Sequence, residues 1–175
     1  MKGSGKHDDL PCIEATRLVV TQAQPEDVTD ILCWRNDPLV RAMSRCHEPI
    51  SELAHGAWYS RAVKDKNRLL LIGIYDGQKI GMVRFDYSPD TLWEVSIMLA
   101  AEARGQGLAR HFLRMGLDRL HLARGPVSVL AVARLNNEPS IRLFHALGFS
   151  RESDDGEFVR LLYHAKYQCP ESEIR

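Results

Sequence analysis

The sequence predicts a mixed α/β domain in which helices pack on a single layer of sheet. Three observations predict this fold class. Residues 68–99 contain three strand-like runs with short turns between them, residues 109–120 have the spacing of an amphipathic helix, and residues 127–133 form a short apolar run. A strand meander followed by a helix and a buried strand is typical of one sheet with helices on it. At 175 residues the chain is long enough for one domain with its own core.

The first third of the chain is expected to contain one strand and two helices. Residues 16–23 alternate and are rich in β-branched side chains, which predicts a strand. Pro25 opens the first helix, because proline fits a first helical turn. Ser51 is the expected N-cap of the second helix. That helix is expected to pack through four apolar residues, Leu53, Ala54, Ala57 and Trp58. Between the helices, residues 34–50 are rich in polar groups and proline, which indicates an irregular segment.

The middle of the chain carries the clearest local signals. Residues 68–75 and 79–87 are strand-like and flank an Asp-Gly pair at 76–77, a strong hairpin signal. A turn at 88–90 leads to a third strand at 91–99. These three strands form an antiparallel meander.

The remaining elements alternate between helix and strand. A long helix follows the meander and ends near Gly125, and residues 127–133 have the continuous apolar character of a buried parallel strand. Residues 136–149 predict a short helix capped by Gly148, and residues 158–167 predict a final strand. The long helix is expected to lie on the sheet through Ala109, Phe112, Leu113, Gly116, Leu117 and Leu120.

The composition excludes several classes of function. The 23 basic residues balance 23 acidic ones, which gives no electrostatic case for binding nucleic acid or a membrane surface. The four cysteines lie far apart, which favours free thiols in a reducing compartment, and neither they nor the histidines have metal-ligand spacing, so no metal is expected. The apolar runs are too short to span a bilayer, and the first dozen residues lack the apolar stretch of a secretory signal. A cytoplasmic location is therefore expected.

Gly105 and Gly107 lie just ahead of the long helix, with Arg104 beside them. Glycine is about 1 kcal/mol less favourable than alanine in a helix, so its use there needs a reason. A helix N-terminus offers converging N–H groups and partial positive charge to a diphosphate, and glycine lets the ligand approach. The alternative is a tight strand-to-helix turn without a ligand. Neither a Walker loop nor a dinucleotide fingerprint fits, because no lysine follows the glycines and Arg110 stands where the third glycine would be.

Two motifs together resemble the GNAT superfamily of acetyl-CoA-dependent N-acetyltransferases. Residues 104–109, RGQGLA, are similar to its [QR]-x-x-G-x-[GA] pyrophosphate loop. Residues 137–149, NEPSIRLFHALGF, are similar to its second signature, N-x-x-S-x-x-[LF]-[YF]-x-x-x-G-F. The resemblance covers residues 16–167, with residues 1–15 as a lead-in and 168–175 as a tail. It implies a GNAT fold: one mixed, mostly antiparallel sheet of about seven strands, helices on both faces, and a V-shaped splay between strands four and five.

The resemblance also implies an enzyme whose cosubstrate is acetyl-CoA, lying in the V between strands 91–99 and 127–133. Backbone N–H groups near Met98 and Leu99 would stabilise the oxyanion. The implied cofactor-binding residues are Met98, Leu99, Ala100, Arg104, Gly105, Gln106, Gly107, Leu108, Ala109, Asn137, Ser140 and Phe144. The sequence does not indicate an oligomeric state; dimers are common in the family, and a homodimer is suggested by that analogy alone.

Amide formation requires a base for the amine and a proton for the departing thiolate. Glu94 is the candidate base or water relay, since it is an acid inside an apolar strand. The alternative is a solvated strand position, because Glu94, Ser96 and Met98 share one face by alternation. Many family members carry at the position of Phe144 a tyrosine that protonates the thiol, and phenylalanine cannot donate. Tyr163 in the final strand is an alternative donor.

The segment between the first two helices resembles the subgroup that N-acetylates nucleotide-linked amino sugars, as in pseudaminic-acid-type pathways. Uracil can stack on an aromatic ring, and arginine can bind a diphosphate in bidentate fashion. The residues implied to bind such an acceptor are Trp34, Arg35, Asn36, Arg41, Ser44, His55, Trp58 and Arg84. The alternative is that these residues bind no acceptor: the aromatic ones belong to the core, and the charged ones lie on the surface. Two other functions stay open: acetylation of a protein N-terminus or ribosomal protein, and a non-catalytic acyl-CoA sensor, which Phe144 would suit.

Overall fold

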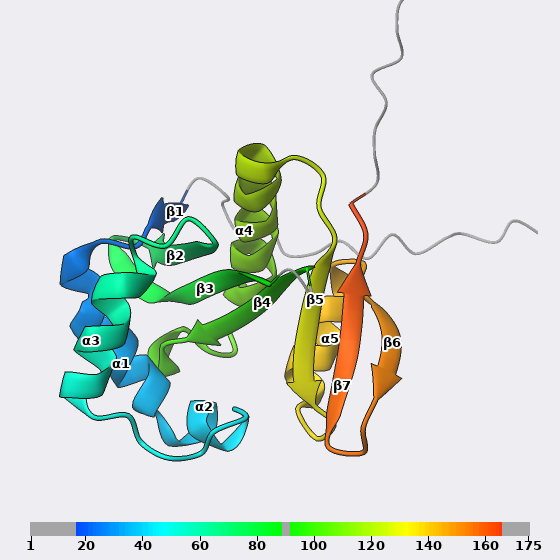
Figure 1. The fold of residues 1–175 in the computed structure, drawn as a ribbon, viewed down its shortest axis with the longest axis horizontal. Helices are drawn as coiled ribbons and strands as arrows, with labels where there is room; N and C mark the ends of the chain where they lie inside the picture. Colours follow the sequence, from blue (N-terminus) through cyan, green and yellow to red (C-terminus); the bar gives the residue numbers. More distant parts are fainter. Residues whose placement is uncertain (1–16, 89–91, 166–175) are drawn as a thin grey trace, which may run out of the picture.

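The computed structural model describes residues 17–88 and 92–165. The expected lead-in, the tail at 168–175 and most of the turn at 88–90 lie outside these residues. Within the described residues, seven strands form one sheet in the order β1-β2-β3-β4-β5-β7-β6 (Figure 1). The strands are β1 Leu18–Gln22, β2 Arg68–Tyr75, β3 Gln78–Ser88, β4 Leu92–Leu99, β5 Val129–Arg134, β6 Ser150–Asp154 and β7 Phe158–Tyr163.

Helices connect and cover the strands. They are α1 Val28–Asn36, α2 Pro38–Ala42, α3 Glu52–Ala62, α4 Leu108–Arg124 and α5 Glu138–Ala146, with 3₁₀ turns η1 Pro25–Asp27 and η2 Ala101–Ala103. The short helix α2 was not predicted, because its five residues are too few to show a helical apolar pattern. The expected mixed α/β class is confirmed.

The helices lie on both faces of the sheet. Val83 and Arg84 are neighbours on β3, so their side chains point to opposite faces. A Cβ built on Gly116 of α4 would lie 3.1 Å from Val83, whereas Trp58 of α3 lies 5.7 Å from Arg84. Helix α5 contacts α4, and α1 contacts α3. Figure 1 accordingly shows α1, α2 and α3 grouped together, away from α5.

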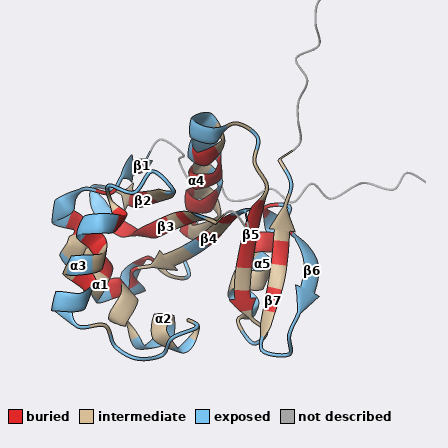
Figure 2. Cartoon of the chain, viewed as in Figure 1, coloured by how far each residue is buried: buried red, intermediate tan, exposed pale blue. Residues whose placement is uncertain are grey.

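Much of the core lies between α4 and the sheet, and Figure 2 shows further buried residues on α1, α5 and the strands. Phe112, Leu113, Leu117 and Leu120 of α4 are almost completely buried, as predicted. The one difference on this face is at its start, where Leu108 is buried and Ala109 only half-buried.

The predicted apolar side of α3 was wrong. Leu53 is 86% exposed, and the buried residues are His55, Tyr59 and Ala62. The polar atoms of both aromatic side chains have hydrogen-bond partners in the interior. The Tyr59 hydroxyl donates to Gln24 O at 2.6 Å, and His55 Nε2 lies 3.0 Å from Val28 O. Because these bonds satisfy the polar atoms, burial of the two rings is favourable. Such partners cannot be seen in the helix sequence alone.

The hairpin at residues 76–77 forms as predicted. Asp76 has φ 51° and Gly77 has φ 77°, the two positive values that a tight two-residue hairpin turn requires. Strand β6 lies at the edge of the sheet with all five residues exposed, which explains why its sequence shows no apolar pattern.

The sheet splays between β4 and β5, its only parallel pair among the described strands. The two strands pair only at Trp93–Val129, Glu94–Leu130 and Val95–Ala131. Strand β4 continues along β3 as far as Leu99, so residues 96–99 separate from β5. The predicted V between the fourth and fifth strands is therefore confirmed, and its open end lies toward the carboxyl ends of both strands.

Candidate functional site

Residues 104–107, here called the glycine loop, lead from β4 into α4 at the open end of the V. Gly105 and Gly107 both have φ 74°, a conformation that favours glycine, and Gly107 is the N-cap of α4. A Cβ built on Gly105 would meet no atom within 4 Å. The glycines therefore satisfy two needs: a left-handed backbone, and open space in front of the helix N-terminus.

The guanidinium of Arg104, one of the implied cofactor-binding residues, is engaged by other groups of the protein. Its guanidinium donates to Leu99 O at 3.2 Å from Nε and 3.0 Å from Nη2, and Nη2 lies 2.9 Å from Asp37 Oδ1. Strand β4 has left β5 at this point, so the carbonyl of Leu99 needs another partner. Arg104 supplies it.

Backbone groups at the end of β4 alternate between the two edges of the strand. Ala100 donates its N–H to Ile80 O at 2.9 Å, toward β3. Leu99 therefore turns its N–H and carbonyl to the opposite edge, where the V opens, while Met98 turns toward β3. Of the two residues expected to supply an oxyanion donor, the structure places Leu99 at the open edge.

Asn137 and Ser140 hold each other at the start of α5. The Asn137 side chain is the N-cap and accepts from Ser140 N at 3.3 Å. Phe144, one turn further along, is 3% exposed, with its ring centroid 5.1 Å from that of Phe149. Helix capping and core packing thus explain these three residues without a ligand.

Tyr163 does not meet Glu94. It pairs with Val129 in the sheet, and its ring stacks on His121 of α4 at 5.8 Å and lies 5.2 Å from Phe149. Glu94 pairs with Leu130, the next residue along β5, and so points to the opposite face. Tyr163, the alternative donor to the departing thiolate, therefore lies on the opposite face of the sheet from Glu94, and its role as a donor stays a prediction.

Glu94 lies on the face covered by α1, α2 and α3, at the point where the V opens. Its carboxylate Oε1 is 2.9 Å from Nη1 of Arg45, and its side chain is 30% exposed. Asp86 is its cross-strand partner on β3 and is 2.7 Å from Arg84 and 3.4 Å from Arg68. Two opposed carboxylates would repel, and these arginines offset that repulsion.

Residues 37–50, here called the 37–50 segment, lie next to Glu94, which pairs with Arg45 of this segment. Asn36 closes its base through two bonds of 2.8 Å to the N–H and carbonyl of Ile50. Arg35 donates to Cys46 O at 3.0 Å, Arg41 to His47 O at 2.8 Å, and Ser44 Oγ to Val40 O at 2.6 Å. Four of the residues expected to bind an acceptor therefore hold the backbone of this segment in place.

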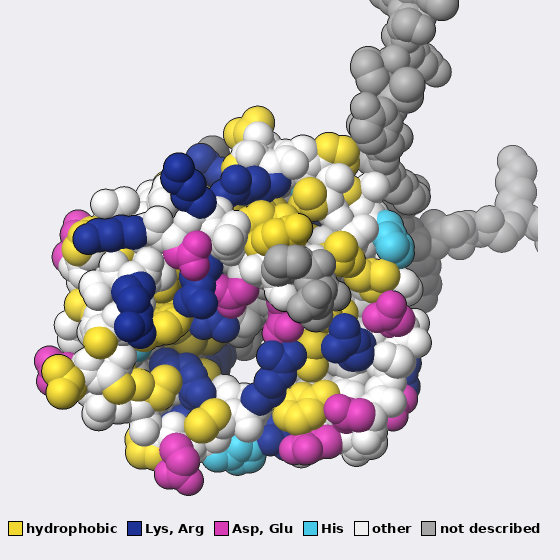
Figure 3. Space-filling model, in the orientation of Figure 1, with side chains coloured by type: hydrophobic (Ala, Val, Ile, Leu, Met, Phe, Trp, Pro, Cys, Tyr) yellow, Lys and Arg dark blue, Asp and Glu magenta, His cyan; other side chains and the backbone are white. Residues whose placement is uncertain are grey.

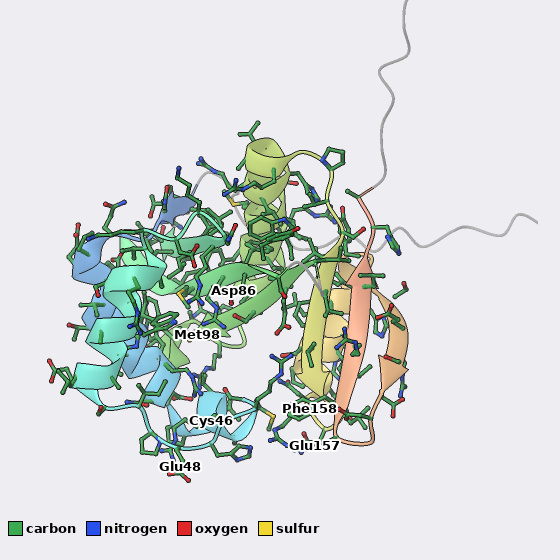
Figure 4. All side chains as sticks on the ribbon, in the orientation of Figure 1. Cys46, Glu48, Asp86, Met98, Glu157 and Phe158 are labelled. Carbon is green, nitrogen blue, oxygen red and sulfur yellow. The ribbon has the colours of Figure 1, made fainter. Side chains whose placement is uncertain are left out.

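Arg134, at the end of β5, joins the segment to the other side of the V. Its guanidinium donates twice to Ser44 O at 3.2 Å, contacts His47, and pairs with Glu157 at 2.8 Å. Arg134 thus contacts both Glu157 and the segment that carries Cys46, two residues labelled in Figure 4. Arg134 and Arg45 were not among the predicted site residues, although a charged residue ending the apolar run at 127–133 was a signal for Arg134.

The aromatic residues expected to contact an acceptor are only partly accessible. Trp34 is 9% exposed and His55 is 2% exposed, and burial lowers the pKa of His55. His55 is therefore a core residue, which corrects its assignment as an acceptor contact. Trp58 is half-buried, with Arg84 at 5.7 Å and Arg68 at 5.9 Å from its ring.

Arginine side chains gather around this site. Burial lowers the pKa of the Arg35 guanidinium, and the positive charges of Arg84 and Arg41 lower it further. Nη1 of Arg35 is buried without a hydrogen-bond partner among the described residues, and neither Arg35 nor Arg41 has a carboxylate within 4.0 Å there. Figure 3 shows Lys and Arg side chains around a hollow on this face.

Within the described ranges, no three His, Cys, Asp or Glu side chains come together as a metal site would require. No helix in those ranges is long and apolar enough to cross a membrane.

Comparison with known proteins gives matches in sequence and in structure. Residues 17–150 match the family model described as the acetyltransferase (GNAT) domain. A mycothiol acetyltransferase from Thermomonospora curvata is 33% identical over 87 residues. That match covers 49% of this chain and 29% of the relative, so the similarity spans less than a third of that protein.

Solved structures share the fold. Spermidine N-acetyltransferase from Vibrio cholerae, in complex with CoA and spermine, superposes with a TM-score of 0.75 at 18% identity, over 86% of this chain and 96% of that one. The structure of yncA from Salmonella typhimurium with acetyl-CoA gives 0.72 at 20% identity, over 89% and 99%. A domain from Methanocaldococcus jannaschii gives 0.72 at 21%, over 85% and 98%.

Proposed function

The chain belongs to the family of GNAT acetyltransferases, enzymes that use acetyl-CoA as acetyl donor, and we propose that its acceptor is the primary amine of a small anionic molecule. A nucleotide-linked amino sugar is the specific candidate. Acetyl transfer is also the activity named for the mycothiol acetyltransferase and for the spermidine N-acetyltransferase.

The observation that carries the proposal is the charge of the acceptor side. The charges of Arg84 and Arg41 add to the effect of burial in lowering the pKa of Arg35, and of these three only Arg84 has a carboxylate partner among the described residues. Burying like charges together is unfavourable unless an anion compensates them. A phosphate or carboxylate on the acceptor would provide that compensation through bidentate bonds.

The cofactor side fits a diphosphate. The N-terminus of the 17-residue helix α4 faces the open space at Gly105, so backbone N–H groups and the helix dipole would bind the pyrophosphate. Bound acetyl-CoA would supply the thioester whose carbonyl the amine attacks. The N–H of Leu99, at the open edge of β4, would donate to the oxygen that becomes negative.

Glu94 is the proposed base for the amine. Its carboxylate is engaged by Arg45 in the absence of an acceptor, so an incoming ammonium group would replace the guanidinium at Oε1. Glu94 would then accept the proton either directly or through one water. No side-chain donor is assigned to the departing thiolate: Phe144 has none, and a thiol with a pKa near ~8.5 leaves with help from water.

Polyamines are the second candidate acceptors, because the spermidine N-acetyltransferase shares the fold and because Asp86 and Glu94 supply negative charge here. A polycation would nevertheless meet Arg35 and Arg41. A basic protein N-terminus meets the same arginines. Two features favour the alternative of a non-catalytic acyl-CoA sensor. Phe144 cannot protonate the thiolate, and the ion pair with Arg45 occupies the carboxylate of Glu94.

A thiol-release assay with acetyl-CoA tests the proposal against UDP-linked 4-amino sugars, spermidine and a basic N-terminal peptide. We expect release with the UDP-amino sugar, and we expect Arg35→Gln to raise the KM for that acceptor with little change in the KM for acetyl-CoA. Arg61→Gln, an exposed change on α3, is the matched control. Release with spermidine or peptide alone would overturn the anionic acceptor. Binding of acetyl-CoA without release for any amine would favour the sensor.

A further inference from the structure

One ion pair connects the glycine loop directly to the 37–50 segment. Arg104 Nη2 lies 2.9 Å from Asp37 Oδ1, and both side chains are mostly buried, with 27% and 22% of their surface exposed. The same guanidinium holds Leu99 O. A single side chain therefore contacts the end of β4, the loop in front of α4, and the first residue of the segment beside Glu94.

Besides pairing with Arg104, Asp37 caps the start of α2. Its carboxylate is the N-cap of that helix and accepts from Leu39 N at 3.0 Å and from Val40 N at 3.1 Å. Although burial raises the pKa of Asp37, the hydrogen bonds from Arg104 and from these amides hold it below its usual value. Helix α2 has only five residues and is too short to be stable alone, so it depends on such contacts.

We propose that Asp37 and Arg104 are a positioning pair that transmits occupancy of the glycine loop to the 37–50 segment. A pyrophosphate bound at Gly105 and Gly107 restricts the backbone that carries Arg104. The restricted guanidinium then fixes Asp37, and through it the first turn of α2. Binding of the coenzyme thereby favours the conformation of the segment that receives the acceptor.

Reciprocity follows from this coupling. If the coenzyme raises acceptor affinity by some factor, the acceptor must raise coenzyme affinity by the same factor. The inference rests on the proposed function only for the coenzyme at the glycine loop. It does not depend on which amine is acetylated.

Hydrogen exchange with CoA as the only ligand tests the pair. In the wild-type protein we expect saturating CoA to slow exchange of the Leu39 and Val40 amides by about fivefold or more, the lower end of typical coupling. Asp37→Asn keeps an N-capping side chain but removes the charge. We expect this variant to bind CoA and to lose the CoA-dependent slowing.

Two further variants separate coupling from simple destabilisation. Arg104→Gln combined with Asp37→Asn should lose no more slowing than either single change, because the pair acts as a unit. Asp154→Asn removes a comparable ion pair with Arg151 on β6 and should leave the slowing intact. The proposal is overturned if CoA binds to the wild-type protein without slowing these amides, or if Asp37→Asn retains the slowing. Failure of CoA to bind the wild-type protein would instead overturn the cofactor assignment in the proposed function.

Discussion

The glycine loop and the 37–50 segment lie on neighbouring sides of one site, but they are held in different ways. The loop takes its shape from its own backbone, with φ 74° at Gly105 and at Gly107. The segment takes its shape from hydrogen bonds to its backbone carbonyls. The side chains that donate them are chiefly those of Arg35, Asn36 and Arg41. A site shaped by backbone is recognisable as a short motif, whereas a site shaped by distant side chains is not.

The largest expected effect lies between the two regions, at Glu94. Glu94→Gln keeps the shape of the side chain but removes the base, so kcat should fall by about 10²- to 10⁴-fold with the active amine. Affinity for acetyl-CoA, measured by calorimetry, should not change, because the glycine loop is untouched. Glu138→Gln, an exposed change on α5, is the control. Equal rates for wild type and Glu94→Gln across pH 6 to 9 would exclude Glu94 as the base.

Asn36→Ala tests whether side chains hold the 37–50 segment. It removes both bonds to Ile50, so we expect a loss of about 2 kcal/mol in the free energy of unfolding, together with faster hydrogen exchange within the segment. Asn136→Ala, at an exposed position, should change neither. If the segment exchanges at the wild-type rate in Asn36→Ala, its shape has another origin.

Gly105→Ala tests the backbone-shaped region. Alanine at this φ costs about 1 kcal/mol, and its methyl group would occupy the space in front of α4, so we expect roughly tenfold weaker binding of acetyl-CoA. Gly125, at the other end of α4, is the matched control: its φ is 77°, and a Cβ there also meets no atom within 4 Å. Gly125→Ala should lower stability at least as much, because Gly125 also has ψ −174°, a region that only glycine adopts readily, and it should leave binding unchanged. Equal binding by both variants would contradict the pyrophosphate site.

The smallest expected effect is on the free energy of unfolding and appears only at high pH. It concerns Tyr59 of α3. Burial, with the nearby charges of Asp27 and Glu26, raises the pKa of Tyr59 to about 12. The unfolded chain ionises this phenol near ~10, so its contribution to stability is complete below that pH and is lost as the pH rises toward 12. Tyr59→Phe should flatten that part of the stability–pH curve in denaturant titrations. A slope unchanged by the substitution would assign the alkaline loss to other groups.

Local signals in the sequence predicted the fold well. The Asp-Gly pair at 76–77, the apolar stripe of α4 and the glycine loop depend on residues within a few positions of one another. The buried side of α3 was predicted wrongly because its polar aromatic residues are satisfied by Gln24 and Val28, more than 25 positions away.

The candidate site was less predictable for the same reason. The sequence indicated Arg104 as a charge beside a ligand, but could not show that the splay leaves the Leu99 carbonyl for it to bind. Nor could it show that Arg134 reaches Ser44 across 90 positions of sequence. Roles that depend on contacts between distant segments require the folded structure.

The narrow ladder between β4 and β5 has a mechanical consequence. In the described part of the chain, three residue pairs join these strands, against eight between β3 and β4 and six between β5 and β7. A pulling force applied across the sheet would meet the least resistance at this seam and would part it there first. The contacts of Arg134 with Ser44 and His47 then still connect the two sides of the V. Removing these contacts would lower the force at which β4 and β5 separate.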